Sequence, residues 1–104
     1  MADTVVFFEE YLPTKISKDP DLARSVGAVF QFNVDGAGTW TLDLTGEGSV
    51  SPGPAESAGC IVATDRETWE KVLDKPSLAV QMFMLGKIKA SNIGLAMSLQ
   101  KILS

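Results

Sequence analysis

The sequence predicts an α+β fold in which helices cover a five-stranded, mainly antiparallel sheet. Three observations support this prediction. Apolar and polar residues alternate through residues 26–45, helical patterns precede and follow the strand region, and one more short strand pattern comes late in the chain. A chain of 104 residues is long enough for one hydrophobic core but too short for two. We therefore expect residues 1–104 to form one domain.

A first helix is expected over residues 5–12. Asp3 or Thr4 can cap it, because each has a side-chain oxygen that can accept a hydrogen bond from the first free amides of a helix. Pro13 is expected to break or kink this helix, since a proline inside a helix removes a backbone hydrogen bond and clashes with the preceding turn. One more helical turn is expected at residues 22–24.

The strands follow from alternation of apolar and polar residues. Residues 26–34 and 39–45 alternate with period two, and the run 35–38 (DGAG) is rich in residues that form hairpin turns. A third strand is expected to begin at residues 49–51 and a fourth to cover residues 59–63. The next helix carries Trp69, Val72 and Leu73 on its inner face, and Thr64 with Glu67 fits a capping box at its start.

The most unusual stretch runs from Ser77 to Ser91. Between Leu78 and Leu85 only Gln81 is polar, so a helix there has no polar face. A helix that is apolar all round has to be covered all round. Our hypothesis is that a bound lipid supplies part of this cover.

The end of the chain is expected to form a strand and a last helix. Gly86 stops the apolar helix, and residues 87–90 alternate like a strand with one solvated face, which we expect to pair away from its sequence neighbours. Ser91 or Asn92 can cap the last helix. One side of that helix carries Leu95, Leu99, Ile102 and Leu103, while Ile93 and Met97 lie off this stripe.

Composition excludes several classes of function. The chain has no histidine, which removes Ser-His-Asp and Cys-His catalysis and most catalytic zinc sites. One cysteine cannot form an internal disulfide, and Cys60 is expected to be a small core residue. The net charge of −4 argues against non-specific nucleic-acid binding. We expect no catalytic residue, no metal and no cofactor.

The charge is unevenly distributed along the chain. All thirteen acidic residues lie at or before Asp74 with five basic residues, a net −8, whereas the chain from Lys75 onward has four lysines and no acid. We consider a transient contact of Lys87, Lys89 and Lys101 with anionic lipid head groups, but favour a solvated face as the interpretation of these lysines. No export signal or membrane-spanning run is visible, so we expect a cytoplasmic monomer.

Two segments near the C-terminus resemble a known family. Phe83–Lys89 (FMLGKIK) followed by Asn92–Gln100 (NIGLAMSLQ) is similar to the C-terminal signature of the sterol carrier protein 2 (SCP2) domain, and Val29–Phe32 with Gly38–Leu42 resembles its first hairpin. The resemblance covers nearly the whole chain. It implies an SCP2-like sheet covered by helices that enclose an apolar tunnel, and a lipid carrier for fatty acids, fatty acyl-CoA, sterols or phospholipids.

The sequence departs from the family pattern at two positions. Leu85 stands where the family often has a glutamine that can contact the polar end of the ligand, and Ser91 stands where a glycine is common. The first departure favours purely apolar contact at that point. The C-terminal residues KILS do not match the peroxisomal address of animal members, so a bacterial-type cytoplasmic member is expected.

If the resemblance holds, many of the excess apolar residues near the C-terminus line a lipid-binding site. Met84→Glu is therefore expected to abolish lipid uptake. Core packing remains an equal interpretation for the two tryptophans. The predicted lining residues are Trp40, Trp69, Leu78, Met82, Phe83, Met84, Leu85, Leu95, Leu99 and Leu103. Two alternatives to a carrier remain: an interaction module that docks a partner enzyme through its apolar C-terminal helices, and an enzyme acting on a bound lipid, which the missing histidine weakens.

Overall fold

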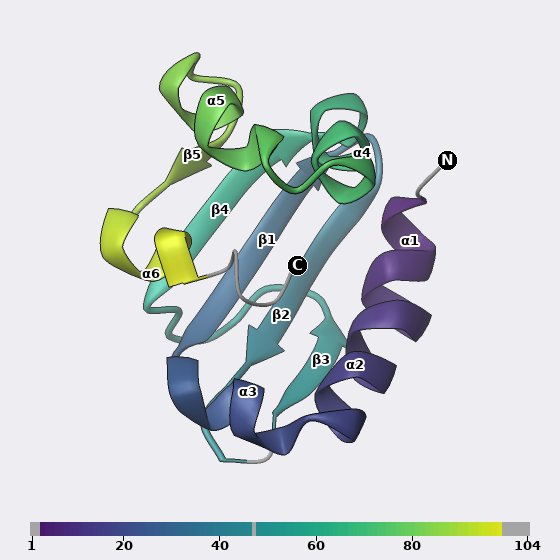
Figure 1. Ribbon diagram of the computed structural model, residues 1–104, viewed down its shortest axis with the longest axis vertical. Helices are drawn as coiled ribbons and strands as arrows, with labels where there is room; N and C mark the ends of the chain where they lie inside the picture. Colours follow the sequence, from purple (N-terminus) through teal and green to yellow (C-terminus); the bar gives the residue numbers. More distant parts are fainter. Residues whose placement is uncertain (1–2, 47, 99–104) are drawn as a thin grey trace.

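The computed structural model describes residues 3–46 and 48–98, and within them five strands form one sheet in the order β3-β2-β1-β4-β5 (Figure 1). Three neighbouring pairs are antiparallel, and the central pair of β1 and β4 is parallel. This confirms a mainly antiparallel sheet. The strands are β1 Val29–Asp35, β2 Gly38–Asp43, β3 Ser49–Pro52, β4 Cys60–Asp65 and β5 Lys89–Ala90.

The helices gather on one face of this sheet, in front of it in Figure 1. The N-terminal helical segments run along the side of β2 and β3, whereas α5 and α6 lie beside β4 and β5. The segments are α1 Thr4–Val6, the π-helical turn η1 Phe7–Tyr11, α2 Leu12–Lys18, α3 Pro20–Val26, α4 Arg66–Asp74, α5 Leu78–Met84 and α6 Ile93–Ser98.

The parallel pair arises because β4 does not pair with β3, the strand before it. The connecting loop carries the chain back across the sheet, where Gln31 accepts a hydrogen bond from the Ala55 amide at 3.1 Å and the Gly59 amide donates to the Val29 carbonyl at 2.9 Å. Strand β5 then pairs with β4, the preceding strand. The expectation that the last strand pairs away from its neighbours is therefore wrong, and β4 is the displaced strand.

The first helix does not break at Pro13. Segments α1, η1 and α2 form one continuous helix, in which the wide turn η1 precedes the proline and the Leu12 amide donates to the Phe7 carbonyl five residues back. A wider turn gives the proline ring room and tolerates its missing amide donor. Phe8 and Leu12 are both buried, so packing on the sheet favours helix on both sides of the proline.

The helix caps differ from prediction at one position. Asp3 caps α1 as one of the two predicted candidates, accepting from the Val6 amide at 3.1 Å. The capping box at Thr64 is wrong, because β4 continues through Asp65 and the alternation turns Thr64 inward, where its hydroxyl donates to the Lys87 carbonyl at 3.0 Å. Asp65 is the cap instead, and accepts from the Thr68 amide at 2.7 Å.

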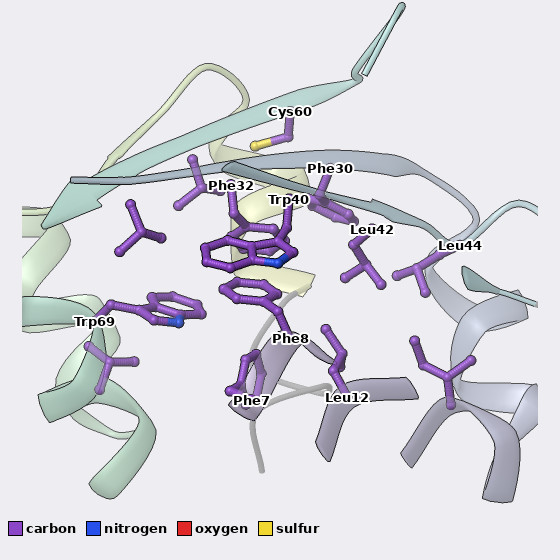
Figure 2. Close-up of a cluster of buried hydrophobic side chains, with 14 of the residues drawn as sticks. Phe7, Phe8, Leu12, Phe30, Phe32, Trp40, Leu42, Leu44, Cys60 and Trp69 are labelled. Carbon is purple, nitrogen blue, oxygen red and sulfur yellow. The ribbon is translucent and has the colours of Figure 1, made fainter. Parts of the chain in front are cut away.

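The core lies between the inner face of the sheet and the helices (Figure 2). Phe8 is central to it: its ring stacks on Trp40 with centroids 4.6 Å apart, and lies parallel to that of Trp69 at 5.9 Å. Cys60 is fully buried, as predicted for a small core residue. The inner face of the central strands supplies Phe30, Phe32, Val34, Leu42 and Val62.

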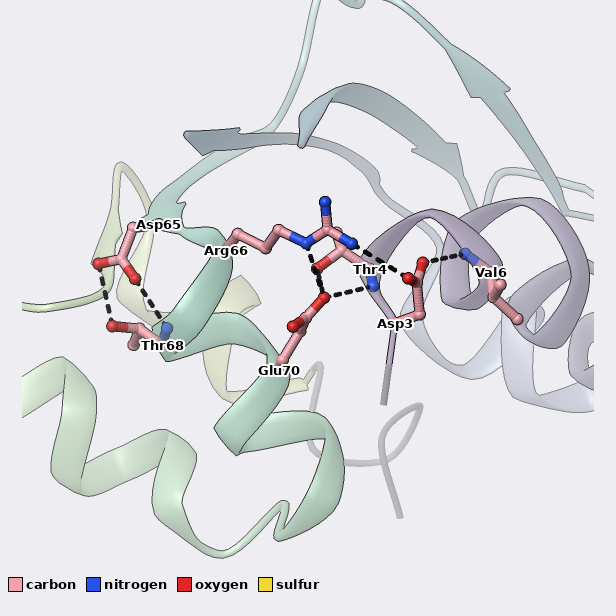
Figure 3. Close-up of polar contacts among 7 residues, drawn as sticks. All are labelled: Asp3, Thr4, Val6, Asp65, Arg66, Thr68 and Glu70. Atoms are coloured by element: carbon pink, nitrogen blue, oxygen red, sulfur yellow. Dashed lines mark hydrogen bonds and ion pairs between the residues drawn. The ribbon is translucent and has the colours of Figure 1, made fainter. Parts of the chain in front are cut away.

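A polar network joins the start of α1 to α4 (Figure 3). One Glu70 carboxylate oxygen accepts from the Thr4 amide at 2.9 Å, the Thr4 hydroxyl at 3.1 Å and the Arg66 guanidinium at 3.0 Å. Arg66 also donates to Asp3 at 3.0 Å. Desolvation raises the pKa of Glu70, but the hydrogen bonds from Thr4 and Arg66 and the Arg66 charge together outweigh it and lower the pKa below its ordinary value of 4.5.

This network predicts a pH-dependent stability. Because the pKa of Glu70 is lower in the folded than in the unfolded state, its stabilisation is fully present above pH 4.5 and is lost as the pH falls through the lowered value. Glu70→Gln is expected to lower the free energy of unfolding by about 1 kcal/mol at pH 7 and by progressively less below pH 4.5. Urea unfolding monitored by circular dichroism between pH 3 and 7 measures this difference.

Glu67→Gln on the same helix is the control, since Glu67 pairs with an exposed Lys71. A Glu70→Gln curve that runs parallel to wild type at all pH values contradicts the assignment.

Candidate functional site

An apolar groove lies where α5 and α6 meet the edge of the sheet formed by β4 and β5. It is partly open to solvent and has a cavity volume of about 60 Å³. All ten of its described lining residues are apolar: Val62, Trp69, Ala79, Val80, Phe83, Ile88, Ala90, Ile93, Ala96 and Met97. The structure therefore describes a groove, and an enclosed tunnel stays a prediction.

The periodicity of each element brings these side chains together. Val62 on β4 and Ile88 just before β5 are buried on the inner face, because side chains alternate across a sheet. Ala79 and Phe83 are four residues apart on α5, and so share one face of that helix. Gly86, with a φ of 76°, ends the α5 segment in a left-handed conformation that favours glycine and turns the chain back toward β5.

Helix α6 closes the other side of the groove. Asn92 caps it, since its side chain accepts from the Leu95 amide at 3.1 Å, and Ser91 instead accepts from the Ile61 amide at 2.8 Å. Ile93, Ala96 and Met97 lie three and four residues apart and face the groove. Ile93 and Met97, which lie off the stripe that contains Leu95, are thus among the residues of the last helix that face the groove.

Helix α5 is only partly covered by the protein. None of its seven described residues is buried, although six of them are apolar. Met84 is 80% exposed, and Leu85 just after the helix is 61% exposed. A helix that is apolar all round should be shielded from water on all sides, and the described part of the chain does not shield α5 in this way.

The predicted lining residues fall into four groups. Trp69 and Phe83 line the groove. Leu78, Met82 and Leu95 are partly buried and pack against the core. Trp40 is buried in the aromatic core on β2 and does not line the groove, while Met84 and Leu85 lie at the surface outside it. Leu99 and Leu103 fall outside the described residues.

Eight lining residues were missed by sequence reasoning. Ile93 and Met97 carried a signal, because they lie off the leucine stripe of α6 and must face something else. Val62 and Ile88 follow from strand alternation once β4 and β5 are known to be neighbours, which the sequence does not show. The others are small or weakly distinctive: Ala79, Val80, Ala90 and Ala96.

The polar groups lie apart from the groove lining. Lys87 and Lys89 are exposed and share a shallow, polar surface depression with Asp35 and Asp65. The Thr68 amide lowers the pKa of Asp65 most, and the charge of Lys87 adds to this effect. The indole N–H of Trp69 is buried and has no hydrogen-bond partner among the described residues. Lys101 falls outside the described residues.

Residues 3–46 and 48–98 contain neither a cluster of metal ligands nor a membrane-spanning helix. No three His, Cys, Asp or Glu side chains come close enough together to hold a metal ion. None of the described helices has the length and apolar character needed to cross a membrane.

Comparison with known proteins points to one family. The model of the SCP-2 sterol transfer family matches residues 8–104. Hydroxysteroid dehydrogenase-like protein 2 from Pongo abelii is 32% identical over 104 residues, and that from Homo sapiens is 31% identical; each match covers 92% of this chain and 24% of the relative. The chain therefore spans about a quarter of the length of these relatives.

Solved structures share the fold. The sterol carrier protein domain 2 of Helicoverpa armigera has a TM-score of 0.78 at 23% identity, covering 97% of this chain and 86% of its own. The palmitated SCP2L2 of Aedes aegypti has a TM-score of 0.76 at 25% identity, covering 98% and 95%. The apo sterol carrier protein 2 of Yarrowia lipolytica has a TM-score of 0.71 at 21% identity, covering 91% and 78%.

Proposed function

This chain belongs to the SCP-2 sterol transfer family, and from this premise we propose that residues 1–104 form a non-enzymatic lipid carrier whose groove between α5 and α6 takes the hydrocarbon part of its ligand. The observation that carries the proposal is the groove itself, lined by ten apolar side chains beside a helix with no buried residue. An apolar chain laid in the groove supplies the missing cover for α5. The family and the fold support a lipid-carrying role.

The ligand has to widen the groove. Its cavity volume of about 60 Å³ is well below the roughly 300 Å³ at which small-molecule pockets begin. No residue of α5 is fully buried, and Leu78, Ala79 and Met82 pack against the core only partly buried, so moving this helix costs less than moving a fully buried one. The groove is therefore a site that opens as a ligand enters it, rather than a preformed cavity.

The energetics suit a long acyl chain. Burying a methylene group contributes about 0.8 kcal/mol, so ten methylenes give about 8 kcal/mol before several kcal/mol of association and ordering costs are subtracted. Micromolar binding follows without a directed polar contact. Binding of this kind depends weakly on the ligand's chemistry, which fits fatty acids, fatty acyl-CoA, sterols or phospholipids as ligands.

The ligand's charged end is expected to remain at the open side of the groove. The described lining holds no charged group, so a carboxylate or phosphate inside it would lose its hydration without compensation. The palmitated form of the Aedes aegypti protein supports an acyl chain as one ligand.

Native mass spectrometry and a fluorescent fatty-acid titration test the proposal. Protein purified without detergent is expected to carry a co-purified lipid, and the stripped protein to bind a fluorescent fatty acid saturably at micromolar concentration. Trp69→Phe and Trp40→Phe separate the two tryptophans: ligand binding should change the intrinsic fluorescence of Trp69, which lines the groove, and leave that of Trp40, which does not, nearly unchanged. Absence of both a bound lipid and saturable uptake would exclude the carrier.

A second candidate function is a docking module for a partner enzyme. The observation in its favour is the exposed apolar surface of α5 and α6. The dehydrogenase-like relatives, of which the chain covers 24%, are consistent with such a module beside an enzyme domain. Stoichiometric binding of a protein partner that persists in lipid-free protein, together with no lipid uptake, would favour this function over the carrier.

A further inference from the structure

The exposure of the lining residues distinguishes the mouth of the groove from its inner end. The exposed lining residues mark the mouth, and they are Val80, Ile93 and Met97. The buried lining residues mark the inner end, and they are Val62, Trp69 and Ile88. A ligand whose charged end stays at the mouth therefore directs the far end of its hydrocarbon chain toward these three buried side chains.

Trp69 differs from the other two buried lining residues in what lies behind it. Val62 is on β4 and Ile88 directly precedes β5, so the backbone of the sheet limits the groove at both. The Trp69 ring instead lies against side chains of the aromatic core, with centroids 5.5 to 5.9 Å away: Phe7, Phe8 and Phe32 (Figure 2). Its indole therefore separates the groove from the aromatic core.

Hydrogen bonds hold helix α4 in place on both sides of Trp69. The Thr68 amide and hydroxyl donate to Asp65 at 2.7 and 3.0 Å. Glu70 accepts from the Thr4 amide at 2.9 Å and from the Thr4 hydroxyl at 3.1 Å (Figure 3). The cost of a large-to-small substitution depends on how far the surroundings can collapse into the space, and an anchored helix collapses little. Space created at position 69 should therefore stay open.

We propose that Trp69 sets the length of the hydrocarbon chain that the groove accepts, because the methyl end of a bound chain stops against its indole. This inference rests on the proposed carrier function, and it defines the favoured ligands as chains whose buried part ends at Trp69. A longer chain leaves its surplus methylenes outside the groove, where they remain in water and add no affinity. The affinity for saturated fatty acids therefore rises with chain length and then levels off.

A series of saturated fatty acids of increasing length tests the role of Trp69. Displacement of a fluorescent fatty acid should show wild-type affinity rising about fourfold per methylene before it levels off. In Trp69→Leu the rise should continue for about two more methylenes, so the longest acids should bind about tenfold more tightly than to wild type. The Trp69 indole N–H has no hydrogen-bond partner among the described residues, so the substitution breaks no hydrogen bond there. Trp69→Phe, a smaller change that preserves the fold if the leucine variant does not, should extend the rise by about one methylene.

Trp40→Leu is the matched control for the leucine variant. Trp40 is buried like Trp69 and also stacks on Phe8, but it does not line the groove. The same atoms are removed from the same core, so its chain-length profile should match that of wild type. Equal shifts in the two leucine variants would attribute the change to a loosened core and would overturn the inference. An unchanged profile in the Trp69 variants would overturn it as well.

Brominated fatty acids report where the methyl end of the chain lies, because bromine quenches indole fluorescence only at close range. In Trp40→Phe the remaining tryptophan is Trp69. An acid brominated near its methyl end should quench this fluorescence strongly, and an acid brominated near its carboxylate should quench it weakly. In Trp69→Phe, which retains Trp40, both acids should quench weakly. Stronger quenching of Trp69 by the bromine near the carboxylate would mean that the chain enters the other way round, and would overturn the inference.

The same measurements separate the length limit from the carrier function. Saturable binding of fatty acids with a chain-length profile that does not depend on residue 69 would overturn the length limit and leave the carrier function intact. Absence of saturable binding at every chain length would overturn the carrier function, and the length limit with it.

Discussion

Replacing Phe8 with alanine is expected to lower the free energy of unfolding by about 3–5 kcal/mol, the cost typical of truncating a buried phenylalanine. The side chain is only 1% exposed, and its ring contacts four other aromatic rings of the core, those of Phe7, Phe32, Trp40 and Trp69. The last three come from β1, β2 and α4, so the cavity left by Phe8 would face rigid elements on several sides. Urea unfolding followed by circular dichroism measures the loss.

Tyr11 provides the matched control on the same helical turn. It is 53% exposed and, among the described residues, its ring stacks on Phe7 alone, with centroids 5.6 Å apart. Tyr11→Ala is expected to cost about 1 kcal/mol or less. Similar losses for the two variants would show that the Phe8 ring is not the centre of the core.

Filling the groove is expected to prevent lipid uptake while preserving the fold. Ala96 lines the groove on α6, where the cavity volume is about 60 Å³. The indole of Ala96→Trp would occupy this space and replace the ligand as the cover of α5. We expect the affinity for a fluorescent fatty acid to fall by about 100-fold or more, since the ring displaces several buried methylene groups at about 0.8 kcal/mol each.

Gln81→Trp is the control for this experiment. Gln81 is on the exposed side of α5 and does not line the groove, so the same ring is added outside the site. Its uptake should match that of wild type. A second filling variant, Val80→Trp, guards against a local defect in α6. If both filling variants bind the fatty acid normally, the ligand occupies another part of the protein.

The strands were predictable from sequence because alternation is a local signal. Phe30, Phe32 and Val34 alternate with polar neighbours, and all three face the core. Sheet order was not predictable, since the parallel pairing of β1 with β4 depends on a loop that crosses the sheet. The capping error at Thr64 has the same origin: the strand continues two residues beyond its expected end at residue 63, because β4 pairs with β1 as far as Asp65.

The groove was predictable only in part. The apolar excess of residues 78–85 indicated a helix that needs cover, and Phe83 from this segment does line the groove. Which tryptophan reaches the groove was not predictable: Trp69 on α4 does, whereas Trp40 on β2 is enclosed by Phe8. Ala90 and Ala96 contribute because five elements (β4, α4, α5, β5 and α6) converge there, a property of the tertiary structure that no local pattern contains.

The absence of buried residues in α5 has a consequence for hydrogen exchange. Together with the two-residue strand β5, α5 forms a unit held by few buried contacts, whereas β1 has neighbours on both sides. Local unfolding of such a unit requires only a fraction of the global unfolding free energy. Backbone amides of residues 78–90 should therefore exchange with deuterium much faster than those of β1, and a bound lipid should slow them selectively. The segment that opens to admit the ligand would then also be the segment whose local unfolding the bound ligand suppresses most.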